Sequence, residues 1–184
     1  KVTVIGEENV PKDQAVLYVA NHRSYFDILL TYSRCPIRTG YVAKKEMEHY
    51  PLLSNWMRNL YCLFLDREDI KQGLKTILQA ADYVKSGISV CIFPEGTRSR
   101  MGNQLLPFKG GTFKSAVRAK CPIVPCALID SYKPFDEKSI APVTVKLIYL
   151  PPICYEEYKG MKTQEIADLV KIRIEEKIQQ EMQA

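Results

Sequence analysis

The sequence has 184 residues, enough for one domain with a buried core. Hydrophobic residues make up 46% and charged residues 26%, a balance that excludes a disordered or fibrous chain. Lysine and arginine exceed aspartate and glutamate by 26 to 21, and the net charge of +5 suits anionic partners such as lipid headgroups, phosphorylated substrates or an acidic carrier protein. Nucleic acid would fit this charge equally well, but no nucleic-acid recognition motif is present.

Short apolar runs of strand length, most of them rich in β-branched or aromatic residues, recur along the chain between turns. The first of these runs begins almost at the first residue. The predicted strands are residues 2–5, 16–20, 61–65, 88–93, 123–129 and 143–150.

Two helical patterns alternate with these strands. Residues 71–85 place Leu74, Ile77, Leu78 and Ala81 on one face, with Gly87 as a stop signal. Thr163 is predicted to cap a last helix, whose buried stripe is Ile166, Leu169, Val170, Ile174 and Ile178. The alternation predicts a single α/β domain over residues 1–184, with helices packed on a mixed, largely parallel sheet.

A third helical pattern, residues 51–60, has two interpretations. Its apolar side is Leu52, Leu53, Trp56, Met57 and Leu60. We favour a stripe that faces the core. The alternative is that some of these residues meet acyl chains or a bilayer surface, with Lys44, Lys45 and Arg58 near the headgroups.

Residues 21–27, Asn-His-Arg-Ser-Tyr-Phe-Asp, follow a predicted buried strand. Ser24 and Asp27 have the spacing of a capping box, which places Asp27 in the first turn of a helix and His22 in the preceding loop. A carboxylate beside an imidazole fixes its tautomer and stabilises the imidazolium, so His22 and Asp27 suit a general base that acts on an alcohol. The alternative is that Ser24 and Asp27 only cap the helix and His22 is incidental.

Two further segments offer anion-binding groups. In residues 93–99, Gly96 allows close backbone approach, Arg98 offers a forked donor for phosphate, and Glu95 could orient that arginine or a substrate hydroxyl. The alternative is a charged surface turn. Arg67 ends a predicted strand just before a helix that starts near Asp69, so Arg67, Lys71 and backbone N–H groups could form an anion pocket. The alternative there is a solvated salt bridge.

Six cysteines are present, none in a C-x-x-C pair, and Cys62, Cys91 and Cys126 lie in apolar runs. We expect reduced thiols in a cytosolic environment rather than a disulfide scaffold or a zinc site. No motif requires a metal, and His49 is expected at the surface.

No apolar run reaches the ~18 residues needed to cross a bilayer, and no signal peptide is recognisable. Because the chain begins at Lys1 and quickly enters a strand, we expect an upstream segment, which could hold a membrane anchor.

Four blocks in order, residues 21–27, 63–67, 93–99 and 123–125, resemble the glycerolipid acyltransferase family, and bacterial 1-acyl-sn-glycerol-3-phosphate acyltransferases most of all. The blocks span about a hundred residues, and residues 107–111 also resemble the lead-in to the family's next helix. One departure is Tyr61, where the family often has glycine. The hydrophobic N-terminal segment common in bacterial members is also absent.

The resemblance implies an enzyme in which His22 and Asp27 are catalytic and which forms phosphatidic acid from a lysophosphatidic acid. It implies that the substrate-binding residues are Arg67, Lys71, Glu95, Gly96, Thr97 and Arg98. It also implies acyl-CoA or acyl-ACP (acyl carrier protein) as donor, no metal or cofactor, and a location at the cytoplasmic face of the membrane. No acyl-enzyme is expected, because a Gly-x-Ser-x-Gly elbow is absent.

Three alternatives stay open. The acceptor could be another lysophospholipid or glycerol 3-phosphate, the enzyme could be a lipid or thioester hydrolase, or the domain could bind lipid without catalysis.

Overall fold

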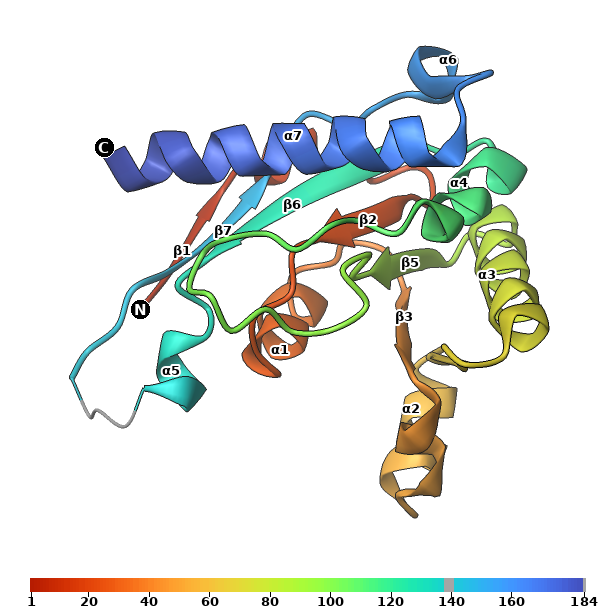
Figure 1. Cartoon of the computed structure of the whole chain (residues 1–184), viewed down its shortest axis with the longest axis horizontal. Coiled ribbons are helices and arrows are strands. Elements are labelled where there is room, and N and C mark those ends of the chain that lie inside the picture. The colour runs from red at the N-terminus through yellow and green to blue at the C-terminus, as the bar shows by residue number, and fades with distance from the viewer. Residues whose placement is uncertain (138–140, 184) are drawn as a thin grey trace.

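The computed structural model describes residues 1–137 and 141–183, which form a seven-stranded sheet flanked by helices (Figure 1). The strand order is β1-β7-β6-β2-β5-β3-β4, and every neighbouring pair is parallel except β6 and β7. The predicted mixed, largely parallel sheet is therefore confirmed. The strands are β1 Val2–Ile5, β2 Leu17–Ala20, β3 Thr39–Lys44, β4 Leu63–Leu65, β5 Ser89–Ile92, β6 Ile123–Ile129 and β7 Val145–Tyr149.

All six predicted strands exist, but the prediction missed β3. Its sequence, Thr-Gly-Tyr-Val-Ala-Lys, has a short apolar stretch and a glycine, which weakens a strand. Gly40 is needed there because a Cβ atom at this position would collide with the backbone carbonyl of Tyr61. A contact between two segments thus explains the weak local signal.

The helices are α1 Phe26–Tyr32, α2 Leu53–Asn59, α3 Ile70–Lys85, α4 Lys114–Ala119, α5 Lys133–Asp136, α6 Tyr155–Tyr158 and α7 Thr163–Gln183. Three 3₁₀ turns, η1 Glu7–Asn9, η2 Lys45–His49 and η3 Gly110–Phe113, complete the element list. The helix predicted over residues 71–85 is α3, and it ends as expected before Gly87, whose φ is +87°. The predicted cap of α7 is wrong by one residue: Thr163 is already helical, and the Glu165 carboxylate accepts a hydrogen bond from the backbone N–H of Lys162.

The sheet has a core on each face because successive side chains of a strand point to opposite sides. On one face, Leu17 and Val19 pack with Ile77 of α3 and the buried stripe of α7. On the other face, Tyr18 and Ala20 pack with residues that include Leu30 of α1 and Tyr41 of β3. Residues on both sides of β2 are therefore buried, which explains its continuous apolar run.

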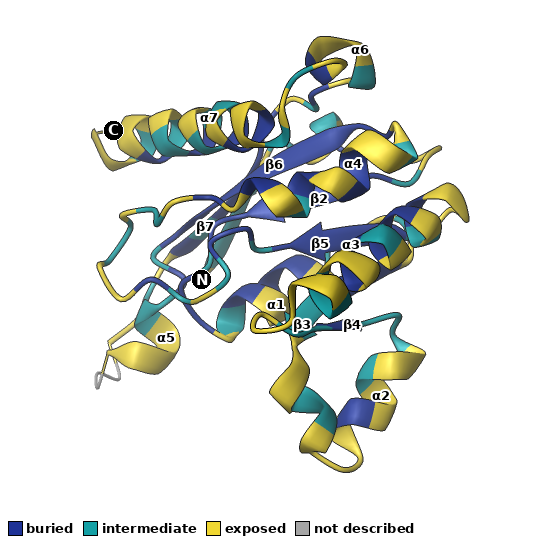
Figure 2. Cartoon of the chain, turned by 45° about the vertical axis from the view of Figure 1, so that its right-hand side comes forward, coloured by how far each residue is buried: buried dark blue, intermediate teal, exposed yellow. Residues whose placement is uncertain are grey.

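The prediction that residues 51–60 face the core is wrong. Ser54 is the one buried residue of α2, whereas Leu52 is 84% and Trp56 57% exposed. Figure 2 shows the η2–α2 segment standing away from the sheet with much of its surface exposed. A helix period fixes which residues share a side, but only the tertiary structure decides whether that side has a partner.

Within residues 1–137 and 141–183, no helix combines the length and apolar character needed to span a membrane.

Candidate active site

The loops that follow β2 and β5 lie side by side, because these two strands are parallel neighbours. The carboxyl ends of parallel strands meet at the same edge of a sheet, which is where ligands bind in open α/β folds. The loop after β2 contains His22, and the loop after β5 contains Phe93–Ser99. Two motifs that are about 70 residues apart in sequence are therefore brought together by one strand pairing.

His22 and Asp27 form a hydrogen-bonded pair, with 2.8 Å between His22 Nδ1 and Asp27 Oδ2. The Asp27 side chain is fully buried, while the His22 side chain remains 16% exposed. His22 Nε2 has no hydrogen-bond partner among the described residues. The imidazole therefore has one nitrogen held by a carboxylate and the other free for a substrate, which is the arrangement of a general base.

Asp27 is held in place by the loop that it supports. Its Oδ2 atom also accepts hydrogen bonds from the backbone N–H groups of Arg23 at 2.6 Å and Ser24 at 2.9 Å. The Ser24 contact is one half of the predicted capping box. The other half differs, because Ser24 Oγ accepts from the N–H of Phe26 rather than from that of Asp27. Asp27 lies in the first turn of α1, as predicted.

Two more contacts fix the imidazole and its loop. The His22 ring stacks on Phe93, with 4.2 Å between ring centroids and 20° between planes. Asn21, which is fully buried, exchanges two hydrogen bonds with the backbone of Leu128 in β6, at 2.7 and 2.9 Å. The ring is thus fixed by packing and the loop by the neighbouring strand, a degree of preorganisation that general-base catalysis requires.

Glu95 lies beneath this loop rather than at a surface turn or beside Arg98. It is 3% exposed, and its Oε1 atom accepts a hydrogen bond from the His22 backbone N–H at 2.7 Å. Its Oε2 atom accepts from the N–H of Leu106 at 2.9 Å and lies 3.4 Å from Nη1 of Arg23. Burial raises the pKa of Glu95, and the Arg23 charge opposes that rise. These contacts indicate that Glu95 positions His22 and Arg23.

Arg23 is not among the predicted site residues, because the pattern in residues 21–27 that predicts the site depends on His22, Ser24 and Asp27. It is 1% exposed, and its Nε and Nη2 atoms have no hydrogen-bond partner among the described residues. Burial lowers the pKa of Arg23, and the charge of Glu95 opposes that effect. No local pattern in the sequence distinguishes this arginine from an exposed one.

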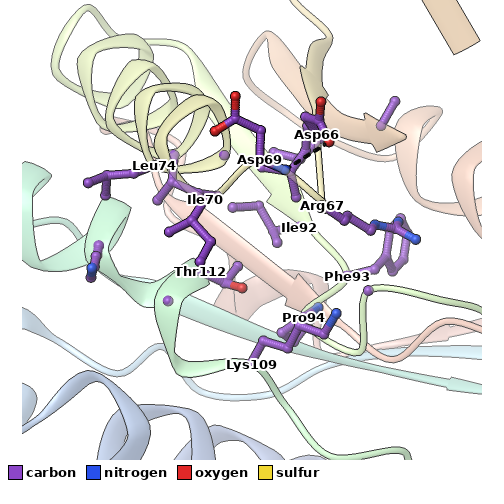
Figure 3. Close-up of a pocket in the computed structure, with 18 residues that line it drawn as sticks. Asp66, Arg67, Asp69, Ile70, Leu74, Ile92, Phe93, Pro94, Lys109 and Thr112 are labelled. Carbon is purple, nitrogen blue, oxygen red and sulfur yellow. Dashed lines mark hydrogen bonds between the residues drawn. The ribbon is translucent and has the colours of Figure 1, made fainter. Parts of the chain in front are cut away.

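A cavity of about 250 Å³, here called the α3 cavity, lies between α3, β5 and η3 (Figure 3). Figure 3 shows Ile70, Leu74 and Ile92 in its interior, with Arg67 beside Phe93 and Lys109 near Pro94. Its apolar lining and its cationic edge suit an amphipathic ligand. The lining residues are Val42, Ala43, Leu65, Asp66, Arg67, Asp69, Ile70, Gly73, Leu74, Ile77, Ile92, Phe93, Pro94, Gly96, Lys109, Gly111, Thr112 and Lys114.

One expectation about this cavity needs correction. Lys71 is exposed and does not line the cavity, so the structure does not bring it together with Arg67. The backbone N–H groups of Lys71 and Gln72 are already bonded to the Asp69 carboxylate, the cap of α3. The anion pocket predicted from Arg67, Lys71 and backbone N–H groups is therefore absent. Leu74, which the helical pattern places on one face with Ile77, is 39% exposed and lines the cavity.

Gly96 and Lys109 fit together at the wall of the α3 cavity. Gly96 has a φ of +72°, and a Cβ atom there would lie 2.9 Å from Lys109 Nζ. Close approach was predicted for Gly96, and the structure shows that the approaching group is a lysine of this chain. Lys109 is not among the predicted site residues, although residues 107–111, which contain it, carry part of the resemblance to the family.

Arg98 lines a second cavity of about 390 Å³, here called the arginine cavity. Its guanidinium lies over the ring of Tyr25, 4.1 Å from the centroid. Arg67 and Arg98, both predicted to bind substrate, thus line different cavities, and Thr97 is exposed. The arginine cavity is lined by Arg23, Arg98, Ser99, Arg100, Gly102, Tyr132, Phe135 and Asp136.

Tyr61 has a φ of +58°, a left-handed conformation that glycine adopts without strain. The glycine that the resemblance leads us to expect at this position would adopt the same backbone conformation without strain. Tyr61 keeps this conformation while its hydroxyl accepts a hydrogen bond from Arg38 at 3.2 Å and its ring packs edge-on against Tyr83.

A family model described as Acyltransferase matches residues 1–129. The chain is 34% identical over 178 residues to a 1-acyl-sn-glycerol-3-phosphate acyltransferase of Cocos nucifera, covering 92% of this chain and 55% of that protein. It is 31% identical over 163 residues to one from Salmonella typhimurium, covering 88% of this chain and 66% of the relative. The chain therefore spans about half to two thirds of the length of these relatives.

The fold is similar to the crystal structure of the 1-acyl-sn-glycerophosphate (LPA) acyltransferase PlsC from Thermotoga maritima. The TM-score is 0.83 at 27% sequence identity, over 100% of this chain and 72% of that one. The sequence match and the shared fold lead to the same conclusion: the chain belongs to the acyltransferase family.

Proposed function

We propose that this protein transfers a fatty acyl group from a thioester to the sn-2 hydroxyl of a 1-acyl-sn-glycerol 3-phosphate, forming phosphatidic acid for phospholipid biosynthesis. The observation that carries the proposal is the His22–Asp27 pair at 2.8 Å. Phe93, on which the imidazole stacks, lines the α3 cavity, and Arg23, the next residue in the chain, lines the arginine cavity. The names of the relatives support the choice of acceptor.

In this reaction His22 Nε2 takes the proton of the acceptor hydroxyl, and the resulting oxygen nucleophile attacks the thioester carbonyl. The C–S bond breaks, the acyl ester forms, and the proton on His22 passes to the leaving thiolate. Asp27 stabilises the imidazolium while it exists. Glu95 and Asn21 hold the loop, so the base needs little rearrangement during the step.

The acyl donor is acyl-CoA or acyl-ACP. The α3 cavity is the site proposed for the apolar part of a substrate, because its interior is lined by Ile70, Leu74 and Ile92 and its edge carries Arg67 and Lys109. No metal or further cofactor is invoked, since a carboxylate-supported imidazole is sufficient for acyl transfer from a thioester.

A location at the cytoplasmic face of the membrane is part of the proposal. The acceptor is a lipid, and the η2–α2 segment presents Tyr50, Leu52 and Trp56, each more than half exposed. Aromatic and aliphatic side chains of this kind, with Lys44 and Arg58 nearby in the chain, suit the bilayer interface. The buried free thiols of Cys91, Cys121 and Cys126 fit a reducing compartment.

The deciding experiment measures acyl transfer to lysophosphatidic acid from both thioester donors, in detergent and in liposomes. Phosphatidic acid is expected from the parent protein. Free fatty acid in its place would identify a hydrolase, and thioester left intact with every acceptor would indicate a lipid-binding domain. Activity with glycerol 3-phosphate or another lysophospholipid, and none with lysophosphatidic acid, would replace the acceptor but keep the reaction.

A further inference from the structure

Lys109 is a cation without a counter-ion at the wall of the α3 cavity. Its ammonium makes no ion pair or hydrogen bond with any residue that the structure describes. The two carboxylates that line the same cavity are engaged elsewhere, because Asp66 is paired with Lys45 and Asp69 caps α3. The charge of Lys109 is therefore available to a ligand.

The backbone on both sides of Lys109 is held by one side chain, the amide of Gln164 in the first turn of α7. Gln164 Oε1 accepts a hydrogen bond from the N–H of Gly110 at 3.1 Å, and its Nε2 donates to the carbonyl of Phe108 at 3.2 Å. The packing is tight, because a Cβ atom at Gly110 would lie 2.8 Å from Gln164 Oε1. The N–H of Lys109 itself donates to the carbonyl of Pro94 at 3.0 Å. The backbone of this segment is thus fixed, and the Lys109 side chain is its available part.

The Lys109 side chain runs along the turn that follows β5. A Cβ atom at Gly96 would lie 2.9 Å from Lys109 Nζ and 3.1 Å from its Cε, and Figure 3 shows the side chain beside Pro94. The N–H of Gly96 donates to the carbonyl of Phe93 at 3.0 Å, and the Phe93 ring stacks on His22. One short turn therefore contacts both the ammonium and the general base.

Acyl transfer requires a positive group at such a place. When the acceptor oxygen bonds to the thioester carbon, the carbonyl oxygen becomes negatively charged, and the carbonyl forms again when the C–S bond breaks. With the acyl chain in the α3 cavity, as proposed above, the thioester lies at the polar edge of that cavity, on the side of His22. A preorganised donor aimed at the developing oxyanion contributes about 10²–10³ in kcat, and an ammonium has three N–H donors and a full charge.

We propose that Lys109 is a further catalytic residue, whose ammonium stabilises the negative charge on the acyl carbonyl oxygen, and that Gln164 is its positioning residue. A carboxamide suits the second role because it donates one hydrogen bond and accepts the other, which an ionised carboxylate does not do. Gln164 lies outside residues 1–129, the part of the chain that the family model matches. The inference rests on the proposed function, because it takes a thioester as the donor.

The experiment measures thiol release and lipid product in the full chain with two donors. Palmitoyl-CoA is the first, and S-palmitoyl-N-acetylcysteamine, which has the same thioester but no phosphate, is the second. The variants are Lys109→Met, Gln164→Ala and the double variant, since methionine keeps the apolar stem beside Gly96 and removes the charge. Lys162→Met and Gln180→Ala are the matched controls, at two exposed residues outside the α3 cavity and the arginine cavity. Urea unfolding checks that every variant folds.

We expect Lys109→Met to lower kcat about 10²-fold with both donors and to change KM much less, because the contact forms in the transition state. Gln164→Ala should lower kcat by about tenfold, because a small displacement of the ammonium weakens that contact. In the Lys109→Met background, Gln164→Ala should have no further effect on kcat, since it acts only through this lysine. The two controls should match the parent. If Gln164→Ala does not fold, Gln164→Glu replaces it, and a smaller loss of kcat is expected because the bond to Gly110 remains.

The inference is overturned if Lys109→Met keeps the kcat of an active parent. It is also overturned if Lys109→Met raises only the KM for palmitoyl-CoA, a result that would make Lys109 a ligand of the coenzyme phosphates. Additive losses in the double variant would refute the positioning role of Gln164. A parent that forms free fatty acid would refute the proposed acceptor and still test Lys109, because thioester hydrolysis passes through the same charged oxygen. A parent that releases no thiol with any acceptor would refute the proposed function and this inference together.

Discussion

Two regions of the molecule depart from the usual distribution of polar and apolar residues, in opposite directions. The region where the loops after β2 and β5 meet the start of α1 buries charge, with Asp27, Glu95 and Arg23 each at most 3% exposed. The η2–α2 segment exposes apolar surface, with Leu52 at 84% and a strained φ of +65°. Neither arrangement contributes much to the stability of the fold. Both occur in one domain, whose remaining core is of the usual apolar kind. The comparison supports the roles proposed for the two regions, acyl-transfer chemistry in the first and contact with a membrane surface in the second.

The largest effect should come from His22, the reactive group of the buried region. His22→Ala should reduce acyl transfer by roughly 10³-fold or more, because the general base is lost. Stability should change little, since the His22 ring is partly exposed and its loop is held by backbone contacts. Initial rates and urea unfolding measure the two quantities. His49→Ala, at an exposed histidine of η2, is the matched control, and equal activity in both variants would refute the proposed base.

The second effect concerns stability in the same region. Glu95→Gln should lower the free energy of unfolding by about 3–5 kcal/mol, because Arg23 stays charged and buried without its counter-ion. The double variant Arg23→Met/Glu95→Gln should recover part of that loss, since the uncompensated charge is gone. Glu46→Gln, at an exposed glutamate paired with Lys44, should unfold like the parent. Urea unfolding of all four proteins makes the comparison, and a Glu95→Gln variant as stable as the parent would contradict the role assigned to this pair.

The third effect tests the exposed region. Trp56→Ala should weaken binding to phosphatidylethanolamine–phosphatidylglycerol vesicles by about tenfold, because a large apolar side chain no longer enters the interface. Its stability should stay close to that of the parent. Ile172→Ser on α7, an exposed apolar residue in another part of the fold, should leave binding unchanged. Flotation assays measure vesicle binding, and equal binding by Trp56→Ala and the parent would contradict a membrane role for this segment.

The smallest effect concerns the attachment of η2 to the sheet. Lys45 contacts Asp66 at 2.7 Å, and this hydrogen bond, together with those from the backbone N–H groups of Glu68 and Asp69, lowers the pKa of Asp66 from 3.8 to about 2. A lowered carboxylate pKa stabilises the fold above the unfolded-state pKa, and that contribution is lost as the pH falls through the folded-state pKa. The stability difference between the parent and Lys45→Met should therefore be constant above about pH 4 and shrink toward pH 2. Urea unfolding across this range measures it, and a difference independent of pH would exclude the ion pair as its cause.

Much of the fold was predictable because the signals are local. The runs at residues 2–5 and 123–129 appear as β1 and β6 with the predicted bounds, since apolar β-branched residues between turns favour strands whatever surrounds them. β3 was missed because Gly40, selected for its contact with Tyr61, weakens the local strand signal. The apolar stripe of residues 52–60 was wrongly predicted to face the core. A helical period shows which side chains share a face, but it does not show whether another element packs against that face.

The candidate site likewise has one part that the sequence predicts and another that only the tertiary structure shows. By itself, the sequence determined the His22–Asp27 pair, because a five-residue spacing across a strand–helix loop brings the two side chains within reach whatever the rest of the chain does. Only the tertiary structure decided that Glu95 supports His22, that Arg23 is buried with unpaired nitrogens, and that Arg67 and Arg98 line different cavities. These relations join the ends of β2, β4 and β5, and the pairing of distant strands that creates them depends on the packing of the whole sheet rather than on any local pattern.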